Sequence, residues 1–352
     1  MEGEKRKRGN TPQEIIDEIL IKLPVKSLVR FKAVSREWRG TMESKYFIEK
    51  HNQYQKSLQL RQVRILIFSE EKRYNGLSLE TMLVSASGLV LHVPPCLLPI
   101  RSFNRFDFYK ITMPCDGLIC IYTHTRIFNL FNPATTIRRR LPYPTSDICD
   151  GGHRVYTLLG IGREKSVISP RYKLLWYYEH DYKRENKSTR CMVFALDTNT
   201  WSHNMERACH REKDLKLLAF DLHTETFESI SITPDIGCRS CHELSMCVLD
   251  HRICIFKRFV DDKDHVFKIW GLEDLHKRSW ELMYSIDLTC LPPEFKEWRI
   301  IPMATINNYL IISNCRLTMW LLYGSKSSIL YRAISPFHLY MSYFETLVSV
   351  YQ

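Results

Sequence analysis

The sequence predicts an α+β protein of two unequal parts: a small N-terminal module of three helices, followed by a large all-β domain of propeller-like architecture. Two patterns carry this prediction. Between residues 11 and 51, apolar residues recur at helical spacing and follow capping residues. From residue 63 onward, short runs rich in β-branched and aromatic residues alternate with Gly, Pro, Asn and Asp, which is typical of many short strands.

The first helix is predicted to begin at Thr11. Thr11 and Glu14 have the spacing of a capping box, and Pro12 stands at the first helical position, which proline favours. Pro24 ends the helix, because a proline moves the residue before it out of the α region. The apolar stripe between these points consists of Ile15, Ile19 and Leu23, with Ile16 and Leu20 beside it.

Two further short helices complete the module. The second contains Val25, Leu28 and Phe31. Ser35 can cap the third, which carries Trp38 and Met42 one turn apart on the same face. Three helices in about 40 residues bury little apolar surface on their own. The module therefore gains most by placing its apolar face against a partner or another domain.

The run from Leu23 to Arg39 closely resembles the F-box of plant F-box proteins. It reads Leu-Pro-Val-Lys-Ser-Leu, then Arg-Phe-Lys-x-Val-Ser-x-x-Trp-Arg. The resemblance implies that residues 11–51 bind a Skp-type linker subunit, and through it a cullin, in an SCF-type cullin-RING ubiquitin ligase. The linker-binding residues that it implies are Pro12, Leu23, Pro24, Val25, Leu28, Phe31, Val34, Ser35 and Trp38.

One position departs from the family. The F-box usually opens its first helix with Leu-Pro, whereas this chain has Thr11-Pro12, so one apolar contact with the linker is expected to be missing. The alternative is that the same residues form only an intramolecular three-helix core. The irregular string of identities favours docking, because core packing tolerates many apolar substitutions.

Composition and charge narrow the function classes. Apolar residues make up 45% of the chain, no apolar run approaches a membrane span, and the tail Met1–Gly9 has no secretory leader, so an intracellular protein with reduced cysteines is expected. The tail 1–10 is predicted to be disordered, and Lys5–Arg8 resembles a nuclear localisation signal or serves solubility alone. The expected location is the nucleus, the cytoplasm or both.

The formal net charge of +11 raises the possibility of a nucleic-acid partner. Clustering marks such a footprint better than net charge does, and the tight clusters are Lys5–Arg8 and Arg138–Arg140. We therefore expect a basic surface rather than a nucleic-acid site. Arg138–Arg140 either lies at a solvated hairpin end or grips an acidic partner.

The β-domain is expected to span residues 63–345, after a polar linker at 52–62 that can continue as helix. A turn pattern recurs along the β-domain, in which an acidic residue or Asn is followed by Thr or Ser. This repeat favours a propeller over the other all-β architectures. The intervals from Asp221 to Glu273 and from Glu273 to Gly324 are each about 50 residues, the length of a kelch-type blade, whereas Asp197 to Asp221 is too short for one. The predicted strands are 63–68, 89–93, 117–122, 125–131, 154–159, 172–178, 190–196, 216–221, 245–249, 252–256, 266–271, 309–313 and 318–323.

A second resemblance covers this region. Cys115-Asp-Gly-Leu-Ile-Cys120 and Leu130-Phe-Asn-Pro-Ala-Thr135 are similar to the opening of the plant F-box-associated domain, a kelch-like interaction domain. The later segments that continue it in order are Leu141-Pro142, 172–175, 193–201, 220–227 and 269–272. The family's strand pair after Trp201 is replaced by the charged segment 202–216, so a shortened blade is expected there. The missing strand pair has three possible consequences: the blade has an exposed edge, a loop covers that edge, or the chain is a decayed gene product.

Metal and cofactor motifs are weak. Cys238-x-x-Cys241-His242 matches a haem attachment pattern, but such attachment needs an export pathway. Cys247 and His251 could add a second pair for zinc, yet they flank a strand with no knuckle turn. We therefore expect no metal site and no cofactor.

Catalytic motifs are also weak. There is no Gly-x-Ser-x-Gly elbow and no P-loop, Gly160-Ile-Gly162 is interpreted as a turn, and Asp261-Asp262-x-Asp264 lacks the Gly and Glu of a calcium loop. Aromatic residues at strand positions are expected in the core rather than in a ligand groove. These are Trp176, Trp201, Trp270, Trp280 and Trp320.

The predicted function, resting on the resemblance, is a non-catalytic substrate-recognition subunit of the ligase. It would bind the linker through the helices and an unidentified target protein through the β-domain. The alternatives are a basic propeller that binds nucleic acid, a propeller enzyme or sugar binder, and a non-functional paralogue.

Overall fold

The structure is a computed structural model in which most of the chain can be described. The described residues are 13–59, 62–71, 76–85, 90–98, 109–123, 127–144, 157–164, 171–182, 186–202, 205–208, 216–232, 236, 244–260, 265–274, 279–296, 300–307, 309–314, 319–324, 328–332 and 338–351.

Four helices form the N-terminal module: α1 (Gln13–Ile21), α2 (Val25–Phe31), α3 (Arg36–Glu43) and α4 (Lys45–Leu58). Ser35 caps α3 as predicted, because its Oγ accepts a hydrogen bond from the amide of Trp38 at 3.0 Å. Ser44 caps α4 in the same way. The capping box at Thr11 and Pro12 lies outside the described residues.

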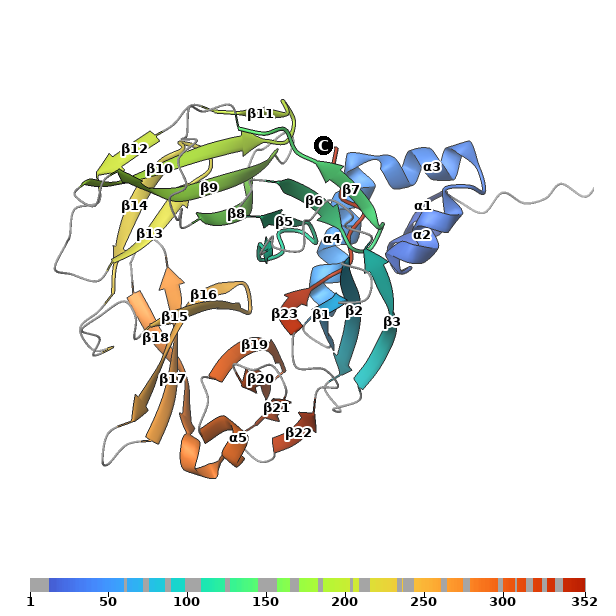
Figure 1. The fold of residues 1–352 in the computed structure, drawn as a ribbon. Coiled ribbons are helices and arrows are strands. Elements are labelled where there is room, and N and C mark those ends of the chain that lie inside the picture. Colours follow the sequence, from blue (N-terminus) through green and yellow to red (C-terminus); the bar gives the residue numbers. More distant parts are fainter. Residues whose placement is uncertain are drawn as a thin grey trace, which may run out of the picture.

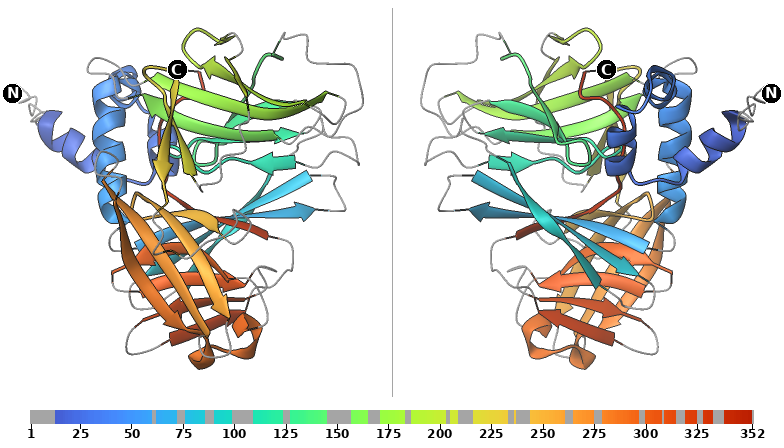
Figure 2. Two further views of the ribbon diagram at one scale, coloured as in Figure 1. Left: turned by 90° about the vertical axis from the view of Figure 1, so that its left-hand side faces the viewer. Right: turned by 90° about the vertical axis from the view of Figure 1, so that its right-hand side faces the viewer.

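The segment expected as a linker at 52–62 is largely helical. α4 continues to Leu58, and its residues His51 and Asn52 are fully buried. A helix whose residues are buried in this way is an interface element rather than a spacer. Figure 2 shows the helices gathered on one side of the sheets.

The predicted α+β class with a propeller-like domain is confirmed. Figure 1 shows the β-sheets following one another around a ring, and every predicted run overlaps a strand. The first sheet contains β1 (Gln62–Glu71), β2 (Gly76–Ser85), β3 (Val90–Leu98) and β23 (His338–Tyr343). The second sheet contains β4 (Tyr109–Ile111), β5 (Ile119–Thr123), β6 (Phe128–Asn132) and β7 (Ile137–Arg140).

The third sheet contains β8 (Thr157–Glu164), β9 (Arg171–Tyr182), β10 (Asn186–Ala195), β11 (Thr200–Trp201) and β12 (Met205–Ala208), and the fourth contains β13 (Lys216–Asp221) and β14 (Thr226–Ser231). The fifth sheet contains β15 (Ser245–Leu249), β16 (Arg252–Val260), β17 (His265–Asp274) and β18 (Ser279–Asp287). The sixth sheet follows the short helix α5 (Pro293–Lys296) and contains β19 (Ile300–Ile306), β20 (Tyr309–Asn314), β21 (Met319–Tyr323) and β22 (Ser328–Arg332).

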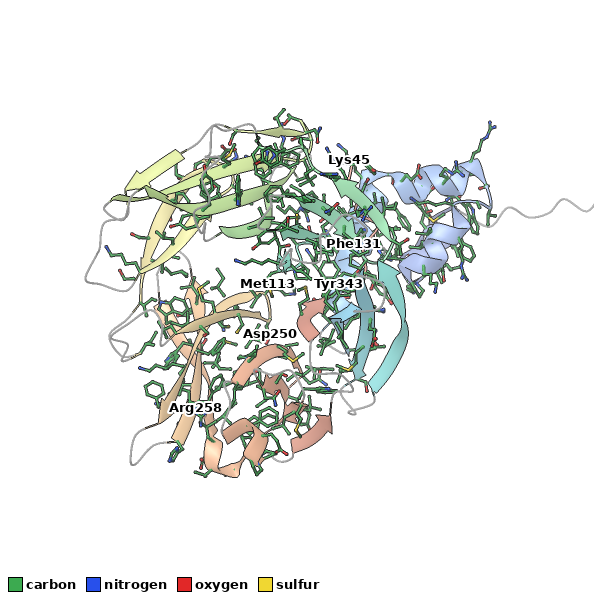
Figure 3. All side chains as sticks on the ribbon, viewed as in Figure 1. Lys45, Met113, Phe131, Asp250, Arg258 and Tyr343 are labelled. Atoms are coloured by element: carbon green, nitrogen blue, oxygen red, sulfur yellow. The ribbon has the colours of Figure 1, made fainter. Side chains whose placement is uncertain are left out.

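The ring is closed by strands from its two ends. β23 pairs antiparallel with β1 in the register Leu66↔Met341, so one sheet combines the last strand with the first three. Phe131 and Tyr343, labelled in Figure 3, belong to the same buried cluster beside this closure. Closure pairs strands that would otherwise be exposed edges.

The fourth sheet is shorter than its neighbours. Among the described residues it has the two strands β13 and β14, whereas the others have four or five. It follows segment 202–216, where a shortened blade is predicted. Part of that segment lies outside the described residues, so the extent of the blade stays a prediction.

Repeated turns share one backbone geometry. Each has four residues between paired strands and a positive φ at the last of them, at Thr136 (58°), Asn199 (57°) and Glu225 (54°). In this register Asp197 corresponds to His223, two positions after Asp221. The equivalence of Asp197 with Asn132 and Asp221 that the sequence suggests is therefore wrong, because it aligns residue types rather than the backbone.

The interpretation of Gly160-Ile-Gly162 as a turn is also wrong. All three residues lie in β8, and Gly162 pairs with Lys173 of β9. A Cβ at Gly162 would overlap the side chain of Leu222. This glycine therefore allows the β13–β14 turn to pack on the strand.

Candidate interaction surface and its support

The helical module has a complete core of its own. Val25 and Leu28 have 0% exposed surface and pack with Leu20, Met42 and Phe47. Two of the residues expected to touch a linker are therefore inside the module. In this structure both side chains are enclosed by the module, and their contact with a linker stays a prediction.

Four large aliphatic side chains of the module are instead exposed. Ile15 and Ile19 are 48% and 55% exposed, Val29 is 40% exposed, and Val34 is 62% exposed. We call these four residues the exposed apolar set. α1 is apolar on two faces, because Ile16 and Leu20 point into the core while Ile15 and Ile19, one turn apart, do not. Sequence reasoning missed this division and assigned the residues to one stripe.

The other predicted linker-binding residues differ in how much of the side chain is exposed. Pro24 is exposed at the N-terminus of α2, and Leu23, Phe31 and Trp38 are half-buried against the module core. The rings of Phe31 and Trp38 meet edge to face, with centroids 5.7 Å apart. Ser35 is occupied as a helix cap, and Pro12 lies outside the described residues. Thus Pro24 and Val34 are the predicted residues most available to a partner.

The C-terminal segment 344–350, which we call the strap, joins the module to the propeller. Leu347 packs in the module core, and Thr346 donates a hydrogen bond to Asn52 at 2.7 Å. From the propeller side, the Asn132 amide donates to the carbonyls of Thr346 (3.1 Å) and Val348 (2.8 Å). The strap is therefore held from both parts at once.

Gly117 permits this close approach. Its φ is +75°, which favours glycine, and an added Cβ would lie 2.8 Å from the carbonyl oxygen of Phe344 and overlap Thr346. Gly117 and Asn132 both belong to the sequence strings that resemble the F-box-associated domain. The structure gives these strings a physical role, which is to hold the strap.

Asp116 forms a buried ionic centre at the same junction. Its carboxylate lies 2.6 Å from Nζ of Lys56 in α4 and 3.1 Å from Arg163 of β8, and it accepts a hydrogen bond from Tyr172 at 2.9 Å. Burial alone would raise the pKa of this carboxyl, but Lys56, Tyr172 and Arg163 outweigh burial and hold it below its usual value. Arg163 also lies 2.8 Å from Glu49 of α4. Asp116 and Arg163 therefore both form ion pairs between the β-domain and α4.

His51 is the buried histidine of the junction. Its Nε2 lies 3.1 Å from the carbonyl oxygen of Leu23, and its Nδ1 is buried without a hydrogen-bond partner among the described residues. Burial lowers its pKa, although the Leu23 carbonyl and Glu345 act in the opposite direction. The imidazole is therefore neutral and donates through Nε2.

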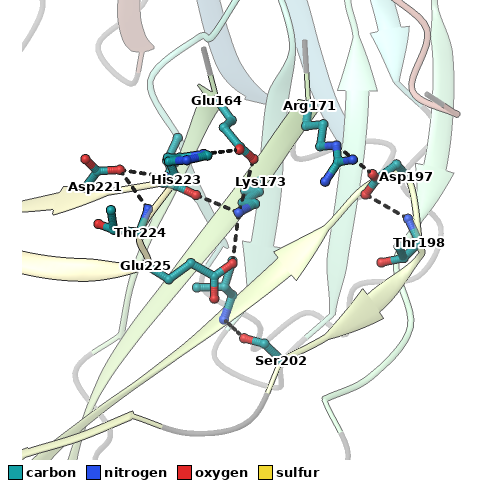
Figure 4. Close-up of polar contacts among 12 residues, drawn as sticks. Glu164, Arg171, Lys173, Asp197, Thr198, Ser202, Asp221, His223, Thr224 and Glu225 are labelled. Carbon is teal, nitrogen blue, oxygen red and sulfur yellow. Dashed lines mark hydrogen bonds and ion pairs between the residues drawn. The ribbon is translucent and has the colours of Figure 1, made fainter. Parts of the chain in front are cut away.

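A second polar cluster lies between the third and fourth sheets and is drawn in Figure 4. Nδ1 of His223 is 2.8 Å from Glu164, and Nζ of Lys173 is 2.9 Å from Glu225 and 3.2 Å from Glu164. The His223 hydrogen bond lowers the Glu164 pKa, against the effect of burial. The cluster clasps the β13–β14 turn onto β8 and β9. Its histidine side chain is 75% exposed, and we assign the cluster a structural role.

The basic run Arg138–Arg140 and the five tryptophans named above lie in strands of the β-domain. Arg139 donates to the carbonyls of Leu196 (3.3 Å) and Val350 (3.0 Å), so the centre of the basic run is used internally. Trp176, Trp270 and Trp320 are buried as predicted, whereas Trp201 and Trp280 are half-buried.

The metal motifs of the sequence fall partly outside the described residues. Cys238, Cys241 and His242, as well as Asp261 to Asp264, lie outside the described residues. Within the described ranges, no three residues of the types His, Cys, Asp or Glu are grouped to hold a metal ion. No helix among them has the length and apolar character needed to cross a membrane.

Comparisons with known proteins agree with this architecture. The F-box domain matches residues 12–50, and the F-box associated beta propeller domain matches residues 67–212. An F-box/LRR-repeat/kelch-repeat protein of Arabidopsis thaliana is 30% identical over 307 residues, covering 79% of this chain and 77% of that protein. An F-box protein of the same plant is 28% identical over 332 residues, covering 79% and 81%. The crystal structure of the tricorn protease matches 77% of this chain and 36% of its own at 8% identity, but its TM-score of 0.26 supports no argument.

Proposed function

The chain belongs to the plant F-box protein family, and from this premise we propose that it is the substrate-recognition subunit of an SCF-type cullin-RING ubiquitin ligase. The helical module binds a Skp-type linker subunit, which connects it to a cullin. The β-domain binds a target protein. F-box proteins are in general adaptors without catalytic groups of their own, and the proposed role is of this kind.

One observation carries the proposal for the linker side. The exposed apolar set lies on a module whose core is already filled by other residues. None of the four residues belongs to that core cluster. Because about half of each side chain is exposed, burying it against a partner is worth roughly 1 kcal/mol. With the exposed ring of Pro24, they are the side chains of the helical module that we propose to dock on another apolar surface.

The strap supports the adaptor role. An adaptor acts by raising the effective concentration of its target near the ubiquitin carrier, and this works only where the geometry allows simultaneous engagement. Asp116, Asn132 and Thr346 bond the module to the propeller through ion pairs and buried hydrogen bonds. A target on the β-domain would therefore be held at a defined place relative to the linker.

The test is complex formation between the purified chain and a purified Skp-type linker. We expect the wild type to co-elute with the linker in size-exclusion chromatography. Ile19→Asp should abolish co-elution, because it places a carboxylate in the apolar contact. Tyr46→Asp is the matched control, since Tyr46 is an exposed aromatic residue of the same module outside the set. Equal co-elution of wild type and Ile19→Asp would remove the proposed docking surface.

A further inference from the structure

Three sulfur atoms from different strands meet in the sheet β15–β18. Cys247 of β15 is directly opposite Cys254 of β16 in the antiparallel register, and Sγ of Cys254 lies 3.7 Å from Sδ of Met283 in β18. The two thiols are hydrogen-bonded to each other. Sequence spacing could not reveal this group, because its members come from three strands of the blade.

Met283 reaches the group through a β-bulge. The register between β17 and β18 shifts between Ile269, which pairs with Tyr284, and Trp270, which pairs with Leu282. Met283 is the extra residue, and it packs against the same core cluster as Cys254 and Cys247. Bulges recur where a strand re-aims one side chain. Here the bulge directs a thioether toward two thiols.

Gly271 leaves the space that the thioether fills. It pairs with Cys254 in β17, the strand that separates β16 from β18. A Cβ at this position would overlap Sδ of Met283 and lie 3.8 Å from Sγ of Cys254. The missing side chain on the intervening strand therefore allows sulfurs from β16 and β18 to come together over it.

We propose that Cys247, Cys254 and Met283 form a binding site for one monovalent soft metal ion, Cu(I). Two thiolates and a thioether are the ligands that select Cu(I). With metal–sulfur bonds of about 2.3 Å, three ligands around one ion place their sulfurs about 4 Å apart. The Cys254–Met283 separation is already close to this value.

The chemistry requires proton loss and no electron transfer. Cu(I) displaces one proton from each thiol and forms two copper–thiolate bonds, and the thioether donates a lone pair without releasing a proton. Because each thiol must release its proton to the metal, binding should strengthen as pH rises. Cys247 and Met283 are partly exposed, which leaves a path for the ion, whereas Cys254 is fully buried.

Two other chemistries fit the group less well. Zn(II) prefers four N, S or O ligands in a tetrahedron, and a thioether is a poor substitute for an anionic or imidazole ligand. A Cys247–Cys254 disulfide would leave no role for Met283, its bulge or the space at Gly271. The third sulfur is therefore the observation that favours Cu(I).

The test titrates Cu(I) into the full chain under anaerobic conditions, in competition with a chromophoric Cu(I) chelator. We expect one ion per chain, sulfur-only coordination by X-ray absorption, and a higher melting temperature with the ion. Met283→Leu should weaken binding by at least about 10-fold and reduce the sulfur neighbours from three to two. Cys254→Ser should abolish the site.

Cys290→Ser and Met246→Leu are matched controls, since both replace exposed sulfur residues outside the group. Neither should change the affinity, and melting curves without metal show whether each variant folds. The proposal is overturned if Met283→Leu keeps the affinity and three sulfur neighbours. It is also overturned if the reduced wild type binds Cu(I) no better than Cys254→Ser. A third contrary result would be a protein that forms the Cys247–Cys254 disulfide in air and does not bind Cu(I).

Discussion

Asn52 in α4 and Thr346 in the strap are 294 positions apart in the chain, yet both are fully buried and joined by a hydrogen bond of 2.7 Å. The Thr346 hydroxyl also accepts from the amide of Val348 at 3.0 Å. One side chain thus fixes the strap to the helical module. The junction between the two parts of the protein is therefore a bonded interface.

Replacing this hydroxyl should destabilise the junction. Thr346→Val keeps the shape of the side chain but leaves buried polar groups of Asn52 and Val348 without their partner. We expect the free energy of unfolding to fall by about 1–3 kcal/mol, measured by urea denaturation. Thr198→Val, at an exposed turn, is the control and should change stability by less than about 0.5 kcal/mol.

Gly117→Ala should be more damaging than an ordinary glycine substitution. The new methyl group would collide with Thr346 and Phe344, and φ at this position is +75°. The strain should cost more than about 1 kcal/mol and shift the thermal midpoint downward. Gly40→Ala is the matched control, because nothing lies within 4 Å of its added Cβ and α3 is helical there. That variant should be as stable as the wild type or up to about 1 kcal/mol more stable. Equal effects of both substitutions would contradict the close approach of the strap.

His51 should make stability depend on pH. Burial lowers its pKa in the folded state, so the unfolded chain binds a proton more readily. The stability that the neutral ring contributes is complete above the unfolded value of about 6.5 and is lost as pH falls through the folded pKa. His51→Gln keeps a donor for the Leu23 carbonyl but does not titrate. Its melting temperature should fall less than that of the wild type between neutral and mildly acidic pH, and parallel curves would contradict this assignment.

Local signals predicted the first three helices of the module, but they did not predict the fourth helix, α4. The caps and apolar spacing of residues 13–43 depend on neighbours a few positions away, and Ser35 performs the predicted role. The orientation of α1 could not be predicted in the same way. Ile15 and Ile19 have the same four-residue spacing as Ile16 and Leu20, so the packing of α1 against the other helices and the strap decides which pair faces inward.

Contacts between residues that are distant in the chain could not be predicted from the sequence pattern. The strap is bonded to Asn52 and Asn132, which are far from it in the chain, and a single sequence does not show which distant residues meet. The sulfur group depends on a one-residue register shift at Met283, which changes the direction of a side chain without any signal in spacing. The strands, by contrast, were predicted because β-branched runs and turn residues are local.

The most direct test of the proposed docking surface compares a surface variant with a core variant by calorimetric titration of a Skp-type linker. For Ile15→Asp/Ile19→Asp we predict at least about a 100-fold loss of affinity with an unchanged melting temperature. Each partly exposed side chain loses roughly 1 kcal/mol of burial in the complex, and a carboxylate takes its place in an apolar contact. For Leu28→Ala we predict the reverse, a stability loss of about 2–5 kcal/mol with an affinity near that of the wild type at a temperature where it stays folded. Unchanged affinity for the surface variant, or a large loss of affinity in the folded Leu28→Ala protein, would contradict docking through the exposed apolar set.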